Sequence, residues 1–162
     1  EKATGAGPPV VCGAASCATV TDVPTMLSAG LPTTSGKVTF TYTPFSTEAM
    51  QRTLLDTQTE SNGLTLYIHA NNALILALGD GTAWSNLVSG AQTWTGLTAY
   101  RLEVEWGNGN AFIRKDGVLI ASTTNGTAKR PTTRAANIAI GNLITGASPA
   151  NGYVSKPQWS IQ

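Results

Sequence analysis

The sequence predicts an all-β fold, an antiparallel two-sheet β-sandwich, from its composition and from the alternation of its apolar residues. Apolar residues make up 41 % of the 162 residues and charged residues only 12 %, so the composition is that of a folded chain rather than a disordered one. The helix formers Glu, Lys and Gln are sparse, whereas β-branched residues and turn formers are abundant. Short apolar runs recur between Gly, Asn, Asp and Pro, which is typical of strands joined by tight turns.

The chain is expected to consist of an N-terminal arm or linker, residues 1–20, and a single domain, residues 21–162. The arm is rich in Gly, Ala and Pro. Cys12 and Cys17 are close enough in sequence for a small disulfide loop outside a reducing compartment, and two free thiols are the alternative. A zinc site is not favoured, because zinc needs about four ligands and His69 is far away in sequence.

The first half of the domain predicts one long strand, one short strand and a hairpin. In the long strand, 36–43, large apolar residues share one face and threonines the other, until Pro44 ends the run. The remaining strands expected in this half are 52–59, 63–70 and 73–81. The last two form a hairpin, because Asn71-Asn72 suits the positive φ of a two-residue turn.

The second half predicts a strand at 99–106, a further hairpin and two closing strands. The strand at 99–106 places apolar and aromatic residues inward, ending at Trp106, and charged residues outward. It passes through a turn at Gly107–Asn110 into a hairpin whose own turn is Asp116-Gly117. The strands expected after 99–106 are 110–114, 118–122, 137–143 and 152–162.

The order of these segments resembles the concanavalin-A-like and laminin-G-like jelly rolls over residues 22–162. In that superfamily a strand of the form aromatic-x-apolar-x-apolar-x-aromatic, here Tyr100 to Trp106, precedes a hairpin with an Asp-Gly turn. An apolar-Gly strand follows, here Ile138 to Gly141, and the last strand returns to pair near the first. The resemblance implies a jelly-roll sandwich. The abundance of Thr, Asn and Gly also resembles a module of a tailed-phage virion protein, which implies an extracellular or virion location.

Some enzymes share this fold, and Glu103-Val104-Glu105 is the nearest match to their catalytic acids. Laminarinase-type glycosidases carry Glu-x-Asp-x-x-Glu, and the third acid is missing here. The opposite face of the same strand has a core pattern, so both glutamates are expected on a solvated face beside Arg or Lys. His69 is the only histidine and no Gly-x-Ser-x-Gly is present, which disfavours a triad. The sequence predicts no enzyme, with a glycoside hydrolase as the minor alternative.

Asp80 is the favoured metal candidate in the sequence, ahead of Asp116 and Asp22. Calcium takes about six to eight oxygen ligands, and Asp80 together with carbonyl and Asn oxygens of nearby loops could supply some of them. The dense Asp-x-Asp-x-Asp spacing is absent. Calcium bound at Asp80 is therefore the one possible cofactor. The alternative is that Asp80 and Gly81 form a turn that binds no ion.

The remaining kind of function is the binding of a ligand by shape complementarity and aromatic stacking. Aromatic rings serve as stacking platforms for sugars, and short polar side chains supply hydrogen bonds. The connection 81–94 is polar enough to run over the surface, where its two tryptophans could contact a ligand. The alternatives are that these tryptophans lie in the core or at a subunit interface. The candidate ligand-binding residues are Tyr67, His69, Asn71, Asn72, Trp84 and Trp94.

The sequence thus predicts a non-catalytic adhesion or carbohydrate-binding module on an extracellular or virion assembly, with a cell-surface polysaccharide as its partner. The alternative is a structural virion protein that contacts its own copies, as a homo-oligomer, or neighbouring virion proteins. A net charge of +1 without a basic run disfavours nucleic acid. No apolar run approaches the ~20 residues that a membrane helix needs.

Overall fold

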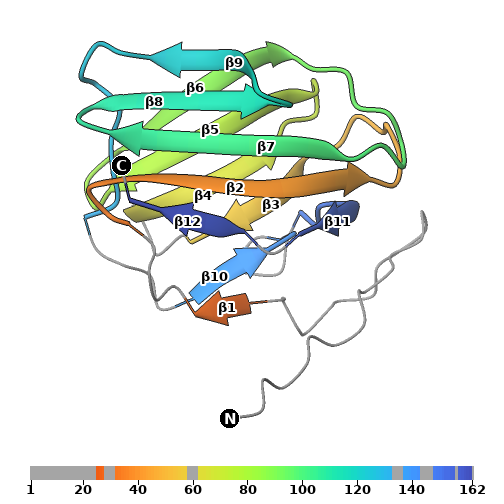
Figure 1. Ribbon diagram of the computed structural model, residues 1–162, viewed down its shortest axis with the longest axis horizontal. Helices are drawn as coiled ribbons and strands as arrows, with labels where there is room; N and C mark the ends of the chain where they lie inside the picture. The colour runs from red at the N-terminus through yellow and green to blue at the C-terminus, as the bar shows by residue number, and fades with distance from the viewer. Residues whose placement is uncertain are drawn as a thin grey trace.

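The computed structural model describes residues 25–27, 32–57, 62–132, 137–142, 148–155 and 157–161, which form two antiparallel sheets packed face to face (Figure 1). In spatial order, sheet A contains β1 (Thr25–Leu27), β10 (Asn137–Ile140), β3 (Arg52–Asp56), β4 (Asn62–Ile68), β5 (Ala73–Asp80) and β6 (Trp84–Ala91). Sheet B contains β11 (Gly152–Val154), β2 (Ser35–Pro44), β7 (Tyr100–Gly107), β8 (Asn110–Lys115) and β9 (Val118–Thr123), and β12 (Gln158–Ser160) also pairs with β2.

The predicted two-sheet sandwich is confirmed, and the described residues contain no helix that could span a membrane. Residues 1–20, with Cys12 and Cys17, lie outside the described residues, so the expected arm and disulfide stay predictions. The closing strands β11 and β12 both pair with β2, as the jelly-roll resemblance implied for the end of the chain.

The alternation in β2 and β7 forms the sheet B side of the core. β7 pairs with β2 along its whole length, from Gly107 opposite Ser35 to Tyr100 opposite Tyr42. Their inward side chains are all nearly inaccessible to solvent: Val38, Phe40, Tyr42, Tyr100, Leu102, Val104 and Trp106. Burial of these side chains, at roughly 1.5–3 kcal/mol for each large apolar residue, holds sheet B against sheet A.

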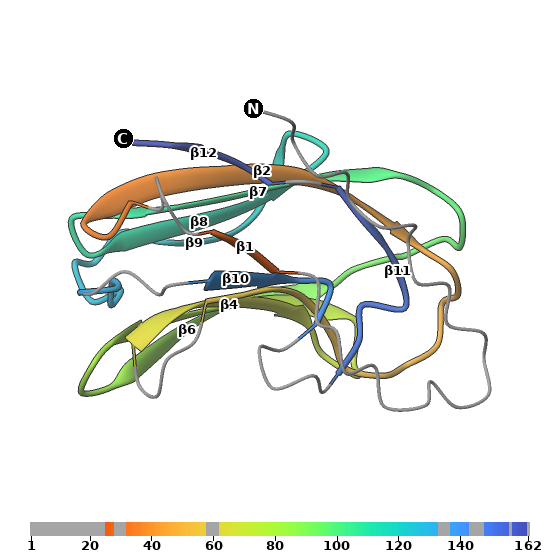
Figure 2. The same ribbon diagram turned by 90° about the horizontal axis from the view of Figure 1, so that it is seen from below.

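The two sheets are bowed in the same direction, and sheet A turns its hollow side away from sheet B (Figure 2). Among the described strands, β6 and β9 are edge strands of their sheets, and they lie next to each other at one side of the sandwich.

Two of the predicted tight turns have the expected backbone. Asn108 and Gly109 between β7 and β8, and Asp116 and Gly117 between β8 and β9, all have positive φ, from 51° to 81°. Such pairs form the type I′ turns whose twist matches that of the strands they join.

The turn between β4 and β5 differs from the prediction. Only Asn72 of the Asn71-Asn72 pair has positive φ, at 66°. The His69 N–H donates to the Ala73 carbonyl, and the Asn72 N–H donates back to the His69 carbonyl. The loop therefore has three residues and ends in a left-handed residue, the next most common hairpin form after the two-residue turn.

The connection 81–94 contains a strand that the sequence did not reveal. β6 occupies Trp84–Ala91 and pairs with β5 along sheet A. It is an edge strand with half of its residues exposed, so its apolar residues alternate weakly and its polar residues make it resemble a loop. Trp84 was expected in an irregular connection, and this is wrong because Trp84 is the first residue of β6. The residue is partly exposed.

Candidate functional site

Alternation along β4 and β5 separates core residues from those on the outer face of sheet A. The side chains that point into the sandwich are at most 1 % exposed: Leu64, Leu66, Ile68, Leu74, Leu76 and Leu78. The intervening residues, including Tyr67, Ile75 and Ala77, therefore point to the opposite, hollow face. Ile75 and Ala77 are buried, yet they do not belong to the apolar cluster between the sheets.

The strand register arranges this face in three rows that cross β4, β5 and β6. The rows are Tyr67–Ile75–Val88, Thr65–Ala77–Asn86 and Gly63–Gly79–Trp84. The central strand carries only short or medium side chains, whereas the rings of Tyr67 and Trp84 stand on the two flanking strands. The face is a floor of short side chains between two aromatic rings, and we call it the sheet A face.

The two rings of the sheet A face stand at diagonal corners. Tyr67 lies opposite Ile75 and Trp84 lies opposite Gly79, four residues further along β5. At the rise of a strand this offset is about 13 Å along the sheet. Both residues are partly exposed, and the partial burial of Tyr67 raises the pKa of its hydroxyl above the ordinary value. The phenol therefore remains a neutral hydrogen-bonding group across physiological pH.

His69 and Asn71 continue the sheet A face beyond Tyr67. Both are exposed, and the His69 Nδ1 lies 3.1 Å from the Asn71 Oδ1. The same Oδ1 accepts from the Ala73 N–H at 3.0 Å, which fixes the orientation of the Asn71 amide. Tyr67, His69 and Asn71 thus lie at one end of one face, and their role in ligand binding stays a prediction.

Asn72 is part of the supporting structure. Its Oδ1 accepts a hydrogen bond from Arg52 Nη2 at 2.9 Å. Its carbonyl accepts from the Trp94 Nε1 and from the Gln92 N–H, both at 3.1 Å. The Asn72 side chain thus has its acceptor engaged inside the protein, where it holds the hairpin tip in place.

Trp94 is a core residue, which is one of the alternatives that the sequence left open, and its selection as a ligand-binding residue is wrong. It is 4 % exposed and packs edge-on against Tyr42 and Tyr100, with ring centroids 5.8 and 5.2 Å away. The Lys115 Nζ lies 4.6 Å from the Trp94 ring centroid. Because its side chain is almost inaccessible to solvent, Trp94 offers no platform to a ligand. The polar stretch around it concealed this role in the sequence.

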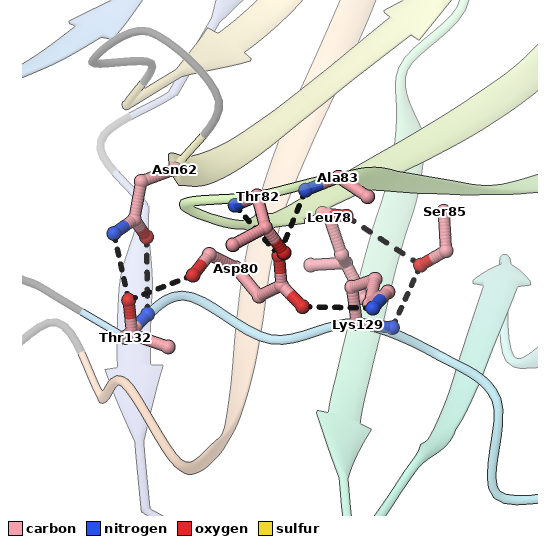
Figure 3. Close-up of polar contacts among 8 residues, drawn as sticks. All are labelled: Asn62, Leu78, Asp80, Thr82, Ala83, Ser85, Lys129 and Thr132. Atoms are coloured by element: carbon pink, nitrogen blue, oxygen red, sulfur yellow. Dashed lines mark hydrogen bonds and ion pairs between the residues drawn. The ribbon is translucent and has the colours of Figure 1, made fainter.

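Asp80, the calcium candidate, is surrounded by protein donors at the end of β5 (Figure 3). Its Oδ1 accepts from the Thr82 N–H, the Thr82 hydroxyl and the Ala83 N–H at 2.7–2.9 Å. Its Oδ2 lies 2.8 Å from the Lys129 Nζ. Lys129, followed by Thr82 and Ala83, holds the pKa of Asp80 well below its ordinary value. Within the described part of the chain no three His, Cys, Asp or Glu residues gather into a metal-binding group.

The same region fastens the segment after β9 to sheet A. The Thr132 hydroxyl donates to the Asp80 carbonyl at 3.0 Å, and Asn62 exchanges two hydrogen bonds with Thr132 (Figure 3). The Lys129 N–H donates to the Ser85 Oγ at 2.7 Å. The carboxylate of Asp80 is therefore a tether in this structure, and a cation there would have to displace an ammonium group.

Glu103 and Glu105 are on the outer face of sheet B, as the sequence predicted. The Arg114 Nη1 lies 3.2 Å from Glu103 and 3.3 Å from Glu105, and the Lys37 Nζ lies 2.7 Å from Glu103. Burial alone would raise the pKa of Glu103, but the hydrogen bond and charge of Lys37, with Arg114 and Arg101, outweigh it and lower the pKa. A lowered pKa is the opposite of what a general acid needs.

Two features of β6 were missed by sequence reasoning because the strand itself was missed. Asn86 lies between Trp84 and Val88 on the sheet A face and is an exposed residue. Val88 is 52 % exposed, so β6 presents an apolar side chain to solvent. The only signal in the sequence was the spacing of Trp84, Asn86 and Val88 at every second position.

No family model and no curated protein matches this chain. Several solved structures resemble it. Domains LG4-5 of the mouse laminin α1 chain superpose with a TM-score of 0.64 and 11 % identity, over 80 % of this chain and 36 % of that one. The CBM40 of the Ruminococcus gnavus IT-sialidase, bound to α2,6-sialyllactose, superposes with a TM-score of 0.64 and 18 % identity, over 80 % of this chain and 79 % of that one.

A third structure, the heptameric SAP-like pentraxin of Limulus polyphemus, superposes with a TM-score of 0.54 and 13 % identity, over 78 % of this chain and 64 % of that one. The chain thus spans about a third of the length of the laminin chain and most of the CBM40. Identities this low show the fold alone. The chain has the two-sheet jelly-roll fold shared by laminin G domains, CBM40 and the pentraxin.

Proposed function

We propose that this chain is a non-catalytic binding module whose ligand is a carbohydrate, and that the ligand lies on the sheet A face. The observation that carries the proposal is the presence of Tyr67 and Trp84 on one face, above a floor of short side chains. Partly exposed rings with a polar tip suit sugars, which present apolar C–H faces and a rim of hydroxyls.

The spacing of the two rings favours an oligosaccharide. An offset of about 13 Å is longer than one sugar ring, so one chain of sugars contacts both aromatic residues. His69 and Asn71 at the Tyr67 end and Asn86 at the Trp84 end supply hydrogen-bonding groups along the same path. The likeness to a CBM40 whose structure contains sialyllactose supports a carbohydrate ligand for this fold.

A binding role rather than hydrolysis is supported by the position of the acids. Glu103 and Glu105 lie on the other sheet, within ion pairs to Lys37 and Arg114. The setting that we propose is an extracellular or virion assembly, where several copies act together on a cell-surface polysaccharide. Multiple copies raise the avidity of a site that is weak by itself.

The proposal is tested by presenting a tetrameric form of the protein to a glycan array. We expect binding that falls at least about tenfold in Trp84→Ala and in Tyr67→Ala, because each removes one stacking platform. Tyr153→Ala is the control, since Tyr153 is an exposed aromatic residue (45 %) on β11 of sheet B. Absence of glycan binding, or equal losses in all three variants, would overturn the proposal.

A structural role is the second candidate, and the exposed apolar residues of the sandwich favour it. Val88 on β6, Val118 and Leu119 on β9, and Leu97 are between 50 % and 75 % exposed. Free edge strands with apolar side chains are surfaces on which copies of a chain or neighbouring proteins pack. Sedimentation of the protein as a stable oligomer, together with loss of Trp84 accessibility to a fluorescence quencher, would favour this role over glycan binding.

A further inference from the structure

We infer that Arg52 is a positioning residue of the proposed site: it does not touch the glycan, and it holds the tip of the β4–β5 hairpin in the form that binds it. This inference rests on the proposed function and adds to it a residue that acts through Asn72. Arg52 begins β3 and lies opposite Ile68 of β4. Ile68 points into the sandwich, so the Arg52 side chain lies on the core side of sheet A, behind the sheet A face.

The hairpin tip is joined to the rest of the protein through one residue. In the described part of the chain, every hydrogen bond of His69 and Asn71 stays within residues 69–73. Asn72, in contrast, is bonded to two other segments. Its carbonyl accepts two hydrogen bonds from the connection after β6, and its Oδ1 accepts one from the Arg52 Nη2 at 2.9 Å. The two residues that we propose as glycan contacts are therefore placed through Asn72.

Asn72 also sets the shape of the tip. Its φ of 66° is in the left-handed region, which asparagine tolerates better than most residues, and its N–H donates to the His69 carbonyl at 2.8 Å. Because Arg52 fixes the side chain of this residue, the turn that presents His69 and Asn71 is held in one conformation. A tip that is ordered before the glycan arrives loses less conformational entropy on binding.

The burial of Arg52 is unfavourable for stability, and this points to a role in function. Arg52 is fully buried, its Nε has no partner, and its hydrogen bonds run to the neutral oxygens of Asn72 and Ser46. A buried cation without a counter-charge lowers stability, and an apolar side chain of similar length would not have this cost. Residues that break the rules of burial are expected where a function requires them. The contact with Asn72, beside the proposed site, is the requirement that we assign to Arg52.

The experiment measures Tm and the apparent affinity on the glycan array for the same set of variants. Arg52→Met removes the buried charge and the hydrogen bond to Asn72, so we expect a Tm equal to or above that of the wild type and an affinity lower by about fivefold or more. Arg52→Lys keeps the charge and a donor, so we expect it to recover part of the affinity at a lower Tm. Ile113→Val, in the core on β8, is the control that lowers the Tm and leaves the affinity unchanged.

The outcomes separate this inference from the proposed function. Wild-type affinity in Arg52→Met, or affinity and Tm that fall together in it, overturns the positioning role and leaves glycan binding intact. If Arg52→Met does not fold, Asn72→Gly decides: it keeps the positive φ without the acceptor, and wild-type affinity in this variant overturns the role. Failure of the wild type to bind any glycan overturns both. Without a glycan, NMR relaxation should show less backbone order at residues 69–73 in Arg52→Met than in Ile113→Val, and equal order would also overturn the role.

Discussion

The guanidinium of Arg52 donates a hydrogen bond to the Oδ1 of Asn72 at 2.9 Å, and this contact ties β3 to the tip of the β4–β5 hairpin. Arg52 is fully buried, and a further hydrogen bond runs to the Ser46 carbonyl at 3.4 Å. Its Nε has no partner, and no carboxylate pairs with it in the described part of the chain. The cation is compensated by neutral oxygens, which is a costly arrangement in a protein interior.

Replacing Asn72 should change stability in opposite directions according to the charge that is introduced. Asn72→Asp keeps the acceptor and adds a counter-charge for Arg52, so we expect a gain of about 1 kcal/mol in the free energy of unfolding at pH 7. Asn72→Gly keeps the positive φ but removes the acceptor, and we expect a loss of about 2 kcal/mol. Urea unfolding of both variants checks this. An aspartate variant less stable than the wild type would contradict the description of Arg52.

The Asp80 tether should make the protein sensitive to acid. Lys129 and the donors of Thr82 and Ala83 lower the pKa of Asp80 in the folded state. A group whose folded pKa is lowered stabilises the fold above its unfolded pKa of about 3.9, and this stabilisation is lost as the pH falls through the folded pKa. We expect Asp80→Asn to flatten the acid side of a plot of Tm against pH below about pH 4. A profile identical to that of the wild type would show that the tether contributes nothing.

Calcium should leave the stability of the protein unchanged. Both oxygens of the Asp80 carboxylate are engaged by protein donors, one of them the Lys129 ammonium. We expect the same Tm in millimolar calcium chloride and in chelator, in line with the absence of differential binding to the folded state. A rise of several degrees in calcium would restore Asp80 as a ligand, and Lys129→Met, which frees the carboxylate, is the variant in which such a rise should first be sought.

Trp94 and Trp84 should respond differently to replacement by phenylalanine. Trp94→Phe loses the hydrogen bond to the Asn72 carbonyl and part of two edge-on ring contacts, and we expect it to lower the free energy of unfolding by about 2 kcal/mol. Trp84→Phe, on the half-exposed edge strand, should change it by less than about 0.5 kcal/mol. Denaturant unfolding followed by circular dichroism measures both; similar losses would mean that Trp84 is also structural.

Two turn glycines with similar φ provide a test of backbone packing. Gly109 and Gly117 have φ of 75° and 81°, so alanine is strained at both, at about 1 kcal/mol. A Cβ at Gly117 meets open space, whereas one at Gly109 would overlap the backbone of Gly126. We expect Gly109→Ala to lower the Tm well beyond the few degrees lost in Gly117→Ala, as differential scanning calorimetry would show. Equal shifts would mean that the segment around Gly126 moves aside at little cost.

Much of the fold could be predicted because strands β2, β4, β5 and β7 are central in their sheets. Their inward residues must be apolar and their turns need residues that tolerate positive φ, so the pattern is visible in the sequence. β6 escaped this reasoning because an edge strand pairs on one side only and tolerates Ser, Asn and Gly. The candidate site was therefore only partly predictable: Tyr67, His69 and Asn71 lie on a predicted hairpin, whereas Asn86 lies on the missed strand.

The sequence by itself determined the class of fold, the core faces of the long strands and the turns at Asn108-Gly109 and Asp116-Gly117, because these depend on local alternation and local backbone geometry. Only the tertiary structure decided which aromatic residues remain available. Trp84 and Trp94 stand in the same polar stretch, yet pairing with β5 leaves the first on the sheet A face, and packing against Tyr42 and Tyr100 buries the second. Exposure depends on contacts between residues far apart in the chain, which no local pattern contains.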